Sequence, residues 1–184
     1  MKKIYIKISA VAVILFAVAG CKKEVPLALA TNGNMSVELT EKNVNPLGNY
    51  SSIILDIKEV DIQYTSKLDG NWTPLQTNAG SYDILQLKNN ISATIAGGKY
   101  PIGIISAVRL MLGEKNSVTV SGDGSHSLEI PDNLKTGIVF TTNTEISTGN
   151  YLLTVLTIDA SKAVLFEQGV YTFRPAIVLK NIIK

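Results

Sequence analysis

Apolar and polar residues alternate along most of the chain from residue 35 on, as they do in β-strands with one face in a core and the other in water. Met35, Val37 and Leu39 alternate with serine, glutamate and threonine near the start of this region. Alternation or short apolar runs recur in segments that we also expect to be strands, namely 72–75, 82–87, 104–112, 117–121, 126–130, 137–141, 151–158, 164–168 and 171–179.

The segment 52–64 changes phase in the middle. Ile53, Leu55 and Ile57 share one parity, whereas Val60, Ile62 and Tyr64 share the other. One extra residue near 58–59 would return the second half to the same face, which is what a β-bulge does. We therefore predict a long, bent strand with a bulge, and the alternative is two short strands joined by a kink.

The connections between these segments are rich in glycine, asparagine and aspartate. The segment 121–125 (SGDGS) is the clearest hairpin turn, because its glycines tolerate the positive φ of tight turns. Pro175 indicates an edge or a bulge, since proline cannot donate to a ladder. Segment 151–158, apolar on both parities, is typical of a central strand. Only two short helical pieces are expected, at 89–96 and at 160–163, where Asp159 would cap the helix.

Many short strands with few helices predict an all-β fold, and we expect an antiparallel β-sandwich over residues 34–184. A domain of this size can bury roughly 70% of its unfolded surface and needs no disulfide. Residues 21–33 carry a proline and the turn-like pair Asn32 and Gly33, and they have no strand or helix period. We interpret them as a tether.

The first twenty residues have the pattern of an export signal. Three lysines, at positions 2, 3 and 7, precede an apolar stretch from residue 8 to 19. This stretch is shorter than the roughly 20 apolar residues that span a bilayer, so a signal helix is favoured over a permanent transmembrane anchor.

The segment 18–21 (VAGC) resembles the lipobox of bacterial lipoproteins. The resemblance implies that peptidase cleavage leaves Cys21 at the mature N-terminus, with acyl chains such as palmitate attached to it. Cys21 is the only cysteine in the chain, so an intramolecular disulfide is impossible, and lipidation explains a lone thiol in an exported protein. The alternative is an ordinary secretory signal with an incidental thiol. Two or three acyl chains make a durable anchor.

Charge argues against a nucleic-acid partner. The chain has 17 Lys and Arg residues and 15 Asp and Glu residues, and the signal contains three of the lysines and no acid. The mature chain would therefore hold 14 basic residues against 15 acidic ones. With only two arginines, this balance gives no electrostatic footprint for nucleic acid.

The order of segments resembles the bacterial lipoprotein domain of unknown function numbered 4382. The matching segments are 35–40 (MSVELT), 57–62 (IKEVDI), 83–89 (DILQLKN), 97–103 (GGKYPIG), 105–113 (ISAVRLMLG), 116–118 (NSV), 158–162 (IDASK) and 173–177 (FRPAI). Two departures are 41–46 (EKNVNP), where the family has a loop with aspartate and proline, and Ile102 in place of a commoner alanine. The resemblance implies a transthyretin-like (prealbumin-like) β-sandwich in the cell envelope, with no established activity.

Few residues suggest catalysis. His126 is the sole histidine, which excludes a cluster of histidines around a metal ion, and its place beside a hairpin turn favours an exposed strand end over a catalytic triad. Asp56, Glu59 and Asp61 form the closest group of carboxylates, and we favour a solvated strand face over a glycosidase pair. Asp123 has the position of a turn residue, although calcium contact is the alternative.

The two arginines lie within apolar strands, where an unpaired buried charge is costly. We expect Arg109 and Arg174 each to have a carboxylate partner or to emerge at the outer sheet face, in preference to binding an anion. Four aromatic residues could form a sugar platform, but core or rim positions are favoured for them. They are Tyr64, Trp72, Tyr82 and Tyr100.

The sequence thus predicts a lipoprotein of the outer membrane, on its periplasmic or its surface face. We expect a non-catalytic binding, adhesion or assembly module that contacts the membrane through acyl chains on Cys21 and an envelope protein or a glycan through its domain. No cofactor, metal ion or nucleic acid is expected. A purely structural envelope component is the alternative, and a glycan-active hydrolase is the less favoured rival.

Overall fold

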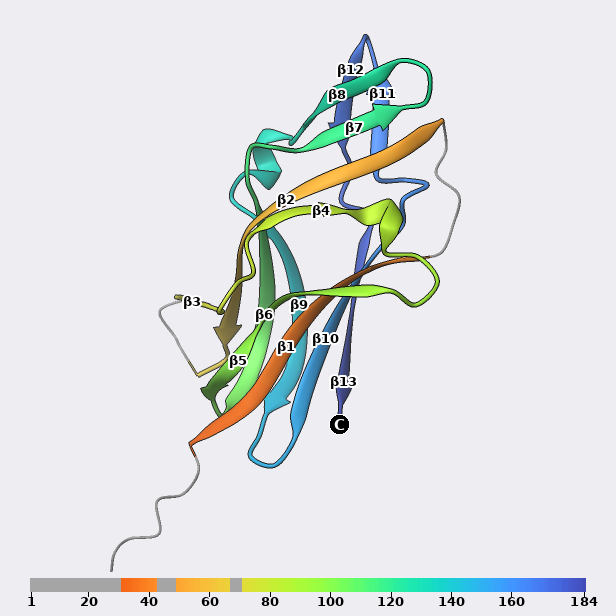
Figure 1. The fold of residues 1–184 in the computed structure, drawn as a ribbon. Coiled ribbons are helices and arrows are strands. Elements are labelled where there is room, and N and C mark those ends of the chain that lie inside the picture. The colour runs from red at the N-terminus through yellow and green to blue at the C-terminus, as the bar shows by residue number, and fades with distance from the viewer. Residues whose placement is uncertain (1–30, 43–48, 67–70) are drawn as a thin grey trace, which may run out of the picture.

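The computed structural model describes residues 31–42, 49–66 and 71–184 (Figure 1). The signal helix at 1–20, Cys21 and the tether up to residue 30 lie outside these residues. Within the described residues, strands dominate and two short 3-10 helices, η1 (Ile84–Gln86) and η2 (Asp132–Leu134), are the only helical elements. The prediction of an all-β fold is confirmed.

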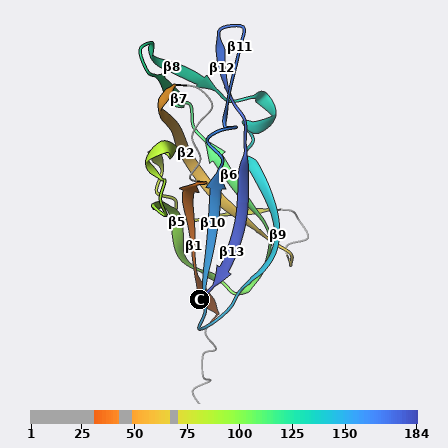
Figure 2. The ribbon, with the colours of Figure 1, turned by 90° about the vertical axis from the view of Figure 1, so that its right-hand side faces the viewer.

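The strands form two sheets, consistent with a β-sandwich. The smaller sheet has the order β13 (Ile177–Ile183), β10 (Tyr151–Ile158), β1 (Asn32–Glu41), β5 (Ser92–Pro101), and Figure 2 shows these four strands side by side. The larger sheet has nine strands. Seven follow the order β11 (Val164–Glu167), β12 (Val170–Phe173), β8 (Gly124–Glu129), β7 (Ser117–Val120), β2 (Tyr50–Tyr64), β6 (Gly103–Leu112), β9 (Ile138–Ile146), while β3 (Trp72–Pro74) and β4 (Gly80–Asp83) pair with β2.

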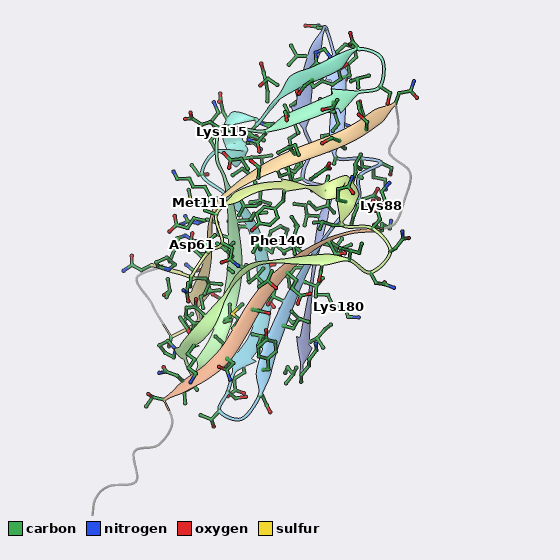
Figure 3. The ribbon with its side chains drawn as sticks, in the orientation of Figure 1. Asp61, Lys88, Met111, Lys115, Phe140 and Lys180 are labelled. Atoms are coloured by element: carbon green, nitrogen blue, oxygen red, sulfur yellow. The ribbon has the colours of Figure 1, made fainter. Side chains whose placement is uncertain are left out.

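The core lies between the two sheets and is made of the apolar parity of each strand. Met35, Val37 and Leu39 of β1 are at most 1% exposed, as their alternation predicts. Phe140 of β9 packs against this core from the larger sheet, and Figure 3 shows it between the two layers. Burial of these side chains is the main favourable contribution to folding.

The bulge expected in segment 52–64 is present in β2. Ile57 pairs with Leu112 and Glu59 pairs with Met111, which leaves Lys58 as the extra residue in the ladder with β6. The apolar residues on both sides of the bulge are consequently buried in one core, from Ile53 to Tyr64. The alternative of two separate strands is wrong, because β2 runs unbroken through the bulge.

The sheets are not purely antiparallel, so that part of the prediction is wrong. β1 and β10 are parallel neighbours over eight residue pairs, and β8 and β12 are also parallel. Alternation within a strand determines which residues face the core but contains nothing about strand direction. Segment 151–158 nevertheless lies between two neighbours, β1 and β13, and is interior as predicted.

The chain changes sheets at Pro175. Segment 171–179 does not form one strand, because β12 ends at Phe173 in the larger sheet and β13 starts at Ile177 in the smaller one. The backbone N–H of Ala176 donates to the carbonyl of Arg174, and that of Ile177 donates to the carbonyl of Pro175. Proline thus marks a corner here and not a bulge within a ladder.

Three local predictions need correction. Segment 89–96 is not helical, because Asn89 and Asn90 have positive φ (56° and 65°) and the chain then enters β5. Segment 82–87 is a strand only to Asp83, whose carboxylate accepts a hydrogen bond from the N–H of Leu85 and starts η1. Segment 160–163 forms a turn, although Asp159 does accept from the N–H of Ser161 as a cap would.

The folded domain begins earlier than the predicted end of the tether at residue 33. β1 begins at Asn32, and Asn32 and Gly33 pair with Pro101 and Tyr100 of β5 instead of forming a turn. Gly33 fits because an added Cβ would collide with the carbonyl oxygen of Ser147. A requirement for close backbone approach, and not for a tight turn, therefore explains this glycine.

Deletion of Lys58 tests the bulge. Without the extra residue, one half of β2 must turn its apolar side chains to the outer face, so we expect loss of cooperative unfolding followed by Trp72 fluorescence. The control Lys58→Ala keeps the residue count, and its free energy of unfolding should stay within about 0.5 kcal/mol of the parent. A deletion variant as stable as the parent would contradict the register.

Candidate binding site

The carboxylates of β2 serve separate structural roles and do not form one acidic site. Asp56 accepts a hydrogen bond from the N–H of Lys115 (3.1 Å), and its own N–H donates to the side chain of Asn116 (2.9 Å). Asn116 in turn donates to the carbonyl of Gly113 (2.8 Å). Asp56 therefore holds the loop between β6 and β7 against the sheet.

Asp61 forms a buried ion pair with Arg109 on the neighbouring strand β6. The Nη2 and Nε atoms of Arg109 lie 2.7 and 2.8 Å from Oδ2 of Asp61, whose side chain is 2% exposed. The guanidinium carbon lies 4.4 Å from the ring centroid of Trp72, so the arginine stacks on that ring. The solvated face expected for Asp61 is wrong, because its side chain is buried in the ion pair with Arg109.

The expectation is confirmed for Arg109 but, for Arg174, only as far as its exposure, because Arg174 follows the last residue of β12 and lies outside the strands. Arg109 has a carboxylate partner, and Arg174 is exposed at the corner between β12 and β13. Neither residue requires a bound anion to explain its position. The sequence does not identify Asp61 as the partner of Arg109, because the two residues lie 48 positions apart along the chain.

His126 lies on the core-side face of β8, near the end of the larger sheet. Its Nε2 is 3.1 Å from Oδ2 of Asp123, and its ring centroid is 5.0 Å from that of Tyr171. The imidazole is one third exposed and lies within β8, so the prediction of an exposed strand-end histidine is wrong. Asp123 lies in the turn before β8, as predicted. Its contact with His126 is not evident from the sequence.

The four aromatic residues considered as a sugar platform are dispersed in the core and at its rim. Tyr64 and Tyr100 are at least 91% buried, and burial together with the neighbouring Tyr100 raises the pKa of Tyr64. Tyr82 donates to the carbonyl of Asn78, and Trp72 lies on Arg109. The favoured core or rim interpretation is confirmed.

A different aromatic group lies at the end of the larger sheet. Tyr171 of β12 lies 4.4 Å from Phe166 and 6.3 Å from Tyr50, measured between ring centroids. Phe166 pairs directly with Tyr171 across the β11–β12 hairpin and is 53% exposed. The sequence contains one signal for this aromatic group, the hairpin turn at Gln168 and Gly169, because such a turn places residues 166 and 171 opposite each other.

One hollow in the described residues has a volume of about 940 Å³, within the range of small-ligand sites. It lies where the bulge of β2, the end of β6, strand β8 and helix η2 meet. Its lining mixes apolar side chains with charges of both signs, among them Lys58, Leu112, Glu114, Glu129, Ile130 and Lys135. This hollow is the candidate binding site, and sequence reasoning missed it.

Asp132 on the lining of the hollow does not have the pKa of a general acid. Asp132 lies 2.6 Å from Nζ of Lys135, and this hydrogen-bonded lysine lowers the pKa of the aspartate while the pKa of the lysine is raised. A catalytic general acid needs a raised carboxyl pKa at neutral pH. The pKa of Asp132 is lowered instead.

Two searches of the described residues bear on other kinds of site. No group of three or more histidine, cysteine, aspartate or glutamate side chains in residues 31–42, 49–66 and 71–184 is arranged to hold a metal ion. In the same residues no helix has the length and apolar composition needed to cross a bilayer.

Comparison with known proteins gives one match. The sequence profile of a domain of unknown function, DUF4382, matches residues 32–175, from the first residue of β1 to the corner before β13. Neither a curated protein nor a solved structure matches the chain.

Breaking the Asp61–Arg109 pair should be costly, whereas removing both charges should not. We expect Asp61→Leu to lower the free energy of unfolding by about 3 kcal/mol, because Arg109 would keep a partly buried charge without its partner. The double variant Asp61→Leu/Arg109→Met should lie within about 1 kcal/mol of the parent. Denaturant unfolding measures the free energy of unfolding of each variant, and Glu145→Leu on the same face is the control. If the effects of the Asp61 and Arg109 substitutions made singly add up in the double variant, the pairing is contradicted.

Proposed function

Because the chain belongs to the DUF4382 family, a domain of unknown function, we propose its role from the site itself: a non-catalytic binding lipoprotein of the cell envelope. The observation that carries the proposal is the hollow of about 940 Å³ beside η2. A site of this size with mixed lining accommodates a ligand that offers both apolar surface and hydrogen-bonding groups.

A glycan or a segment of an envelope protein has this chemistry. Glu114, Glu129 and Lys58 on the lining can accept from or donate to hydroxyl and amide groups. Leu112 and Ile130 offer apolar contact to sugar ring faces or to aliphatic side chains. Both ligand classes bring polar and apolar groups to one surface, and the array experiment below distinguishes between them.

The proposed anchor is Cys21, acylated at the outer membrane. Cys21 lies eleven positions before Asn32, so an extended connection would span at most about 40 Å. β1 begins at the bottom of Figure 1, whereas η2, which borders the hollow, lies near the upper left. A domain held by the start of β1 would thus keep the hollow away from its attachment point.

The proposal includes a transthyretin-like arrangement of the sandwich. Two facing sheets, a core made from the inner parity of each strand and a corner at Pro175 support it. Such a scaffold holds strands rigidly and places variable loops at its ends, where binding residues commonly lie.

Replacement of the cysteine tests the anchor. Cells that express Cys21→Ser should incorporate no labelled palmitate into the protein, which should also keep its signal segment and run larger on a gel. Cys21→Ala should behave in the same way. Normal maturation and unchanged membrane retention of the serine variant without fatty acid would contradict the proposed anchor.

Replacement of Glu129 tests the hollow. The full chain is screened on glycan arrays and on arrays of envelope-protein peptides, and we expect one class to bind. Glu129→Lys should weaken that binding about tenfold or more, because it reverses a charge on the lining. Glu145→Lys, on the same sheet but away from the hollow, is the matched control.

Binding that falls equally in both glutamate variants would place the site elsewhere. Silence on both arrays, with co-purification of envelope proteins, would favour the purely structural role over ligand binding. Turnover of a bound glycan would favour the hydrolase.

A further inference from the structure

The outer face of the four-stranded sheet is basic and apolar at the same time. Strand register places Lys99 of β5, Lys180 of β13 and Lys184 on this face, because they pair with outward-facing residues of β1 and β10. Five apolar side chains share it, and together with the three lysines we call them the basic face. They are Tyr151, Leu153, Val155, Val178 and Ile182.

The opposite outer face, on the nine-stranded sheet, is acidic. The same argument from strand register places six acidic residues on this outer face. They are Asp56, Glu59, Asp61, Glu129, Glu145 and Glu167. Within the described strands of that sheet, Arg109 and the bulge residue Lys58 oppose these acids. Figure 3 shows Lys180 on one side of the molecule and Asp61 and Lys115 on the other. The sandwich is therefore electrically polarised across its thickness.

The three lysines of the basic face outnumber the one acid of the four strands that shares it. That acid is Glu38 of β1, which pairs with the outward-facing Val155 of β10 and whose carboxylate accepts a hydrogen bond from the hydroxyl of Ser92 (2.7 Å). Asp159 lies 3.2 Å from Nζ of Lys42 and 3.7 Å from Nζ of Lys162 at one edge. The hydrogen bond from Ser161, and then Lys42, lowers the pKa of Asp159, so this carboxylate stays ionised and is matched by lysines.

Exposed apolar groups lie among the lysines of the basic face. Val178 is 68% exposed and Tyr151 is 38% exposed. A shallow apolar hollow of about 550 Å³ lies against Val178 and Pro175, with Lys42, Lys162 and Lys180 on its lining. Lysine, tyrosine and aliphatic side chains together are the chemistry of a surface at the bilayer interface, where lysine extends toward headgroups and tyrosine lies at their level.

We propose that the basic face is a second membrane contact of this protein, one that lies against an anionic lipid bilayer. Charge complementarity selects this occupant, because the face offers lysines around apolar groups and the opposite face is acidic. The contact rests on the proposed envelope location but not on the ligand of the hollow. It would turn the acidic face, and with it Glu129 at the hollow, away from the membrane.

Lysine footprinting on the full chain tests the contact without any substitution. The protein is bound to vesicles of three parts phosphatidylcholine to one part phosphatidylglycerol, and acetylation of each lysine is measured by mass spectrometry. We expect Lys99, Lys180 and Lys184 to react severalfold more slowly than on pure phosphatidylcholine vesicles, while Lys115 and Lys135 keep their rates. High salt should restore the reactivity of the three lysines, because the attraction is screened.

Charge reversal tests the same face by affinity. In the mature-length chain (residues 21–184) with Cys21→Ser, which has neither acyl chains nor signal segment, Lys180→Glu/Lys184→Glu should weaken co-sedimentation with the anionic vesicles by roughly tenfold or more, since each lysine near such a surface strengthens binding about fivefold. Lys115→Glu/Lys135→Glu changes the net charge equally on the other side and should reduce binding less than twofold. Circular dichroism establishes that both variants are folded.

Equal lysine reactivity on both vesicle types, or equal loss of binding in the two double variants, would overturn the proposal. These outcomes are separate from a failure of the anchor. The anchor fails if Cys21 contains no fatty acid, whereas the basic face fails only if the lipid composition has no effect on its three lysines.

Discussion

Each strand of this sandwich has to keep its apolar side chains on the inner side of its sheet, and β2 meets that requirement only because of one extra residue. β2 pairs with β3, β4, β6 and β7, so its register is shared by much of the larger sheet. With Lys58 outside the ladder, Ile57 and Val60 both face the core. The same shift leaves Asp61 on the outer side, where it meets Arg109, and leaves Lys58 at the hollow. One local irregularity thus determines the core, the buried ion pair and part of the candidate site.

Features that depend on neighbouring residues were predictable from the sequence, and features that depend on distant pairing were not. Alternation identified β1, an apolar run on both parities identified β10, and a break in the alternation located the bulge in β2. β5 was missed because its two glycines and its bulge opposite β1 obscure the alternation. The parallel pairing of β1 with β10 joins segments more than a hundred residues apart, and no local pattern specifies its direction. A corner such as Pro175 and a bulge offer the same local signal, a proline within an apolar run.

Composition also concealed what the fold brings out. The near balance of 14 basic and 15 acidic residues expected for the mature chain indicates no charged surface. Strand register nevertheless sorts these charges, with lysines outside the four-stranded sheet and carboxylates outside the nine-stranded one. The hollow is equally non-local, since Lys58 and Glu129 come from strands separated by about 70 residues. Neither surface was visible to reasoning that examines one segment at a time.

A modest basic face gains importance when the protein is anchored nearby. Three lysines and a few apolar side chains would give a freely diffusing domain only weak affinity for a bilayer. A domain tethered within about 40 Å of the lipid meets the surface at a high effective concentration, so the same contacts suffice to bias its orientation. In the proposed arrangement the acyl chains would supply retention, and the polarity of the sandwich would determine which side faces outward. The candidate binding site would then face away from the lipid surface, because the opposite side of the molecule would lie against it.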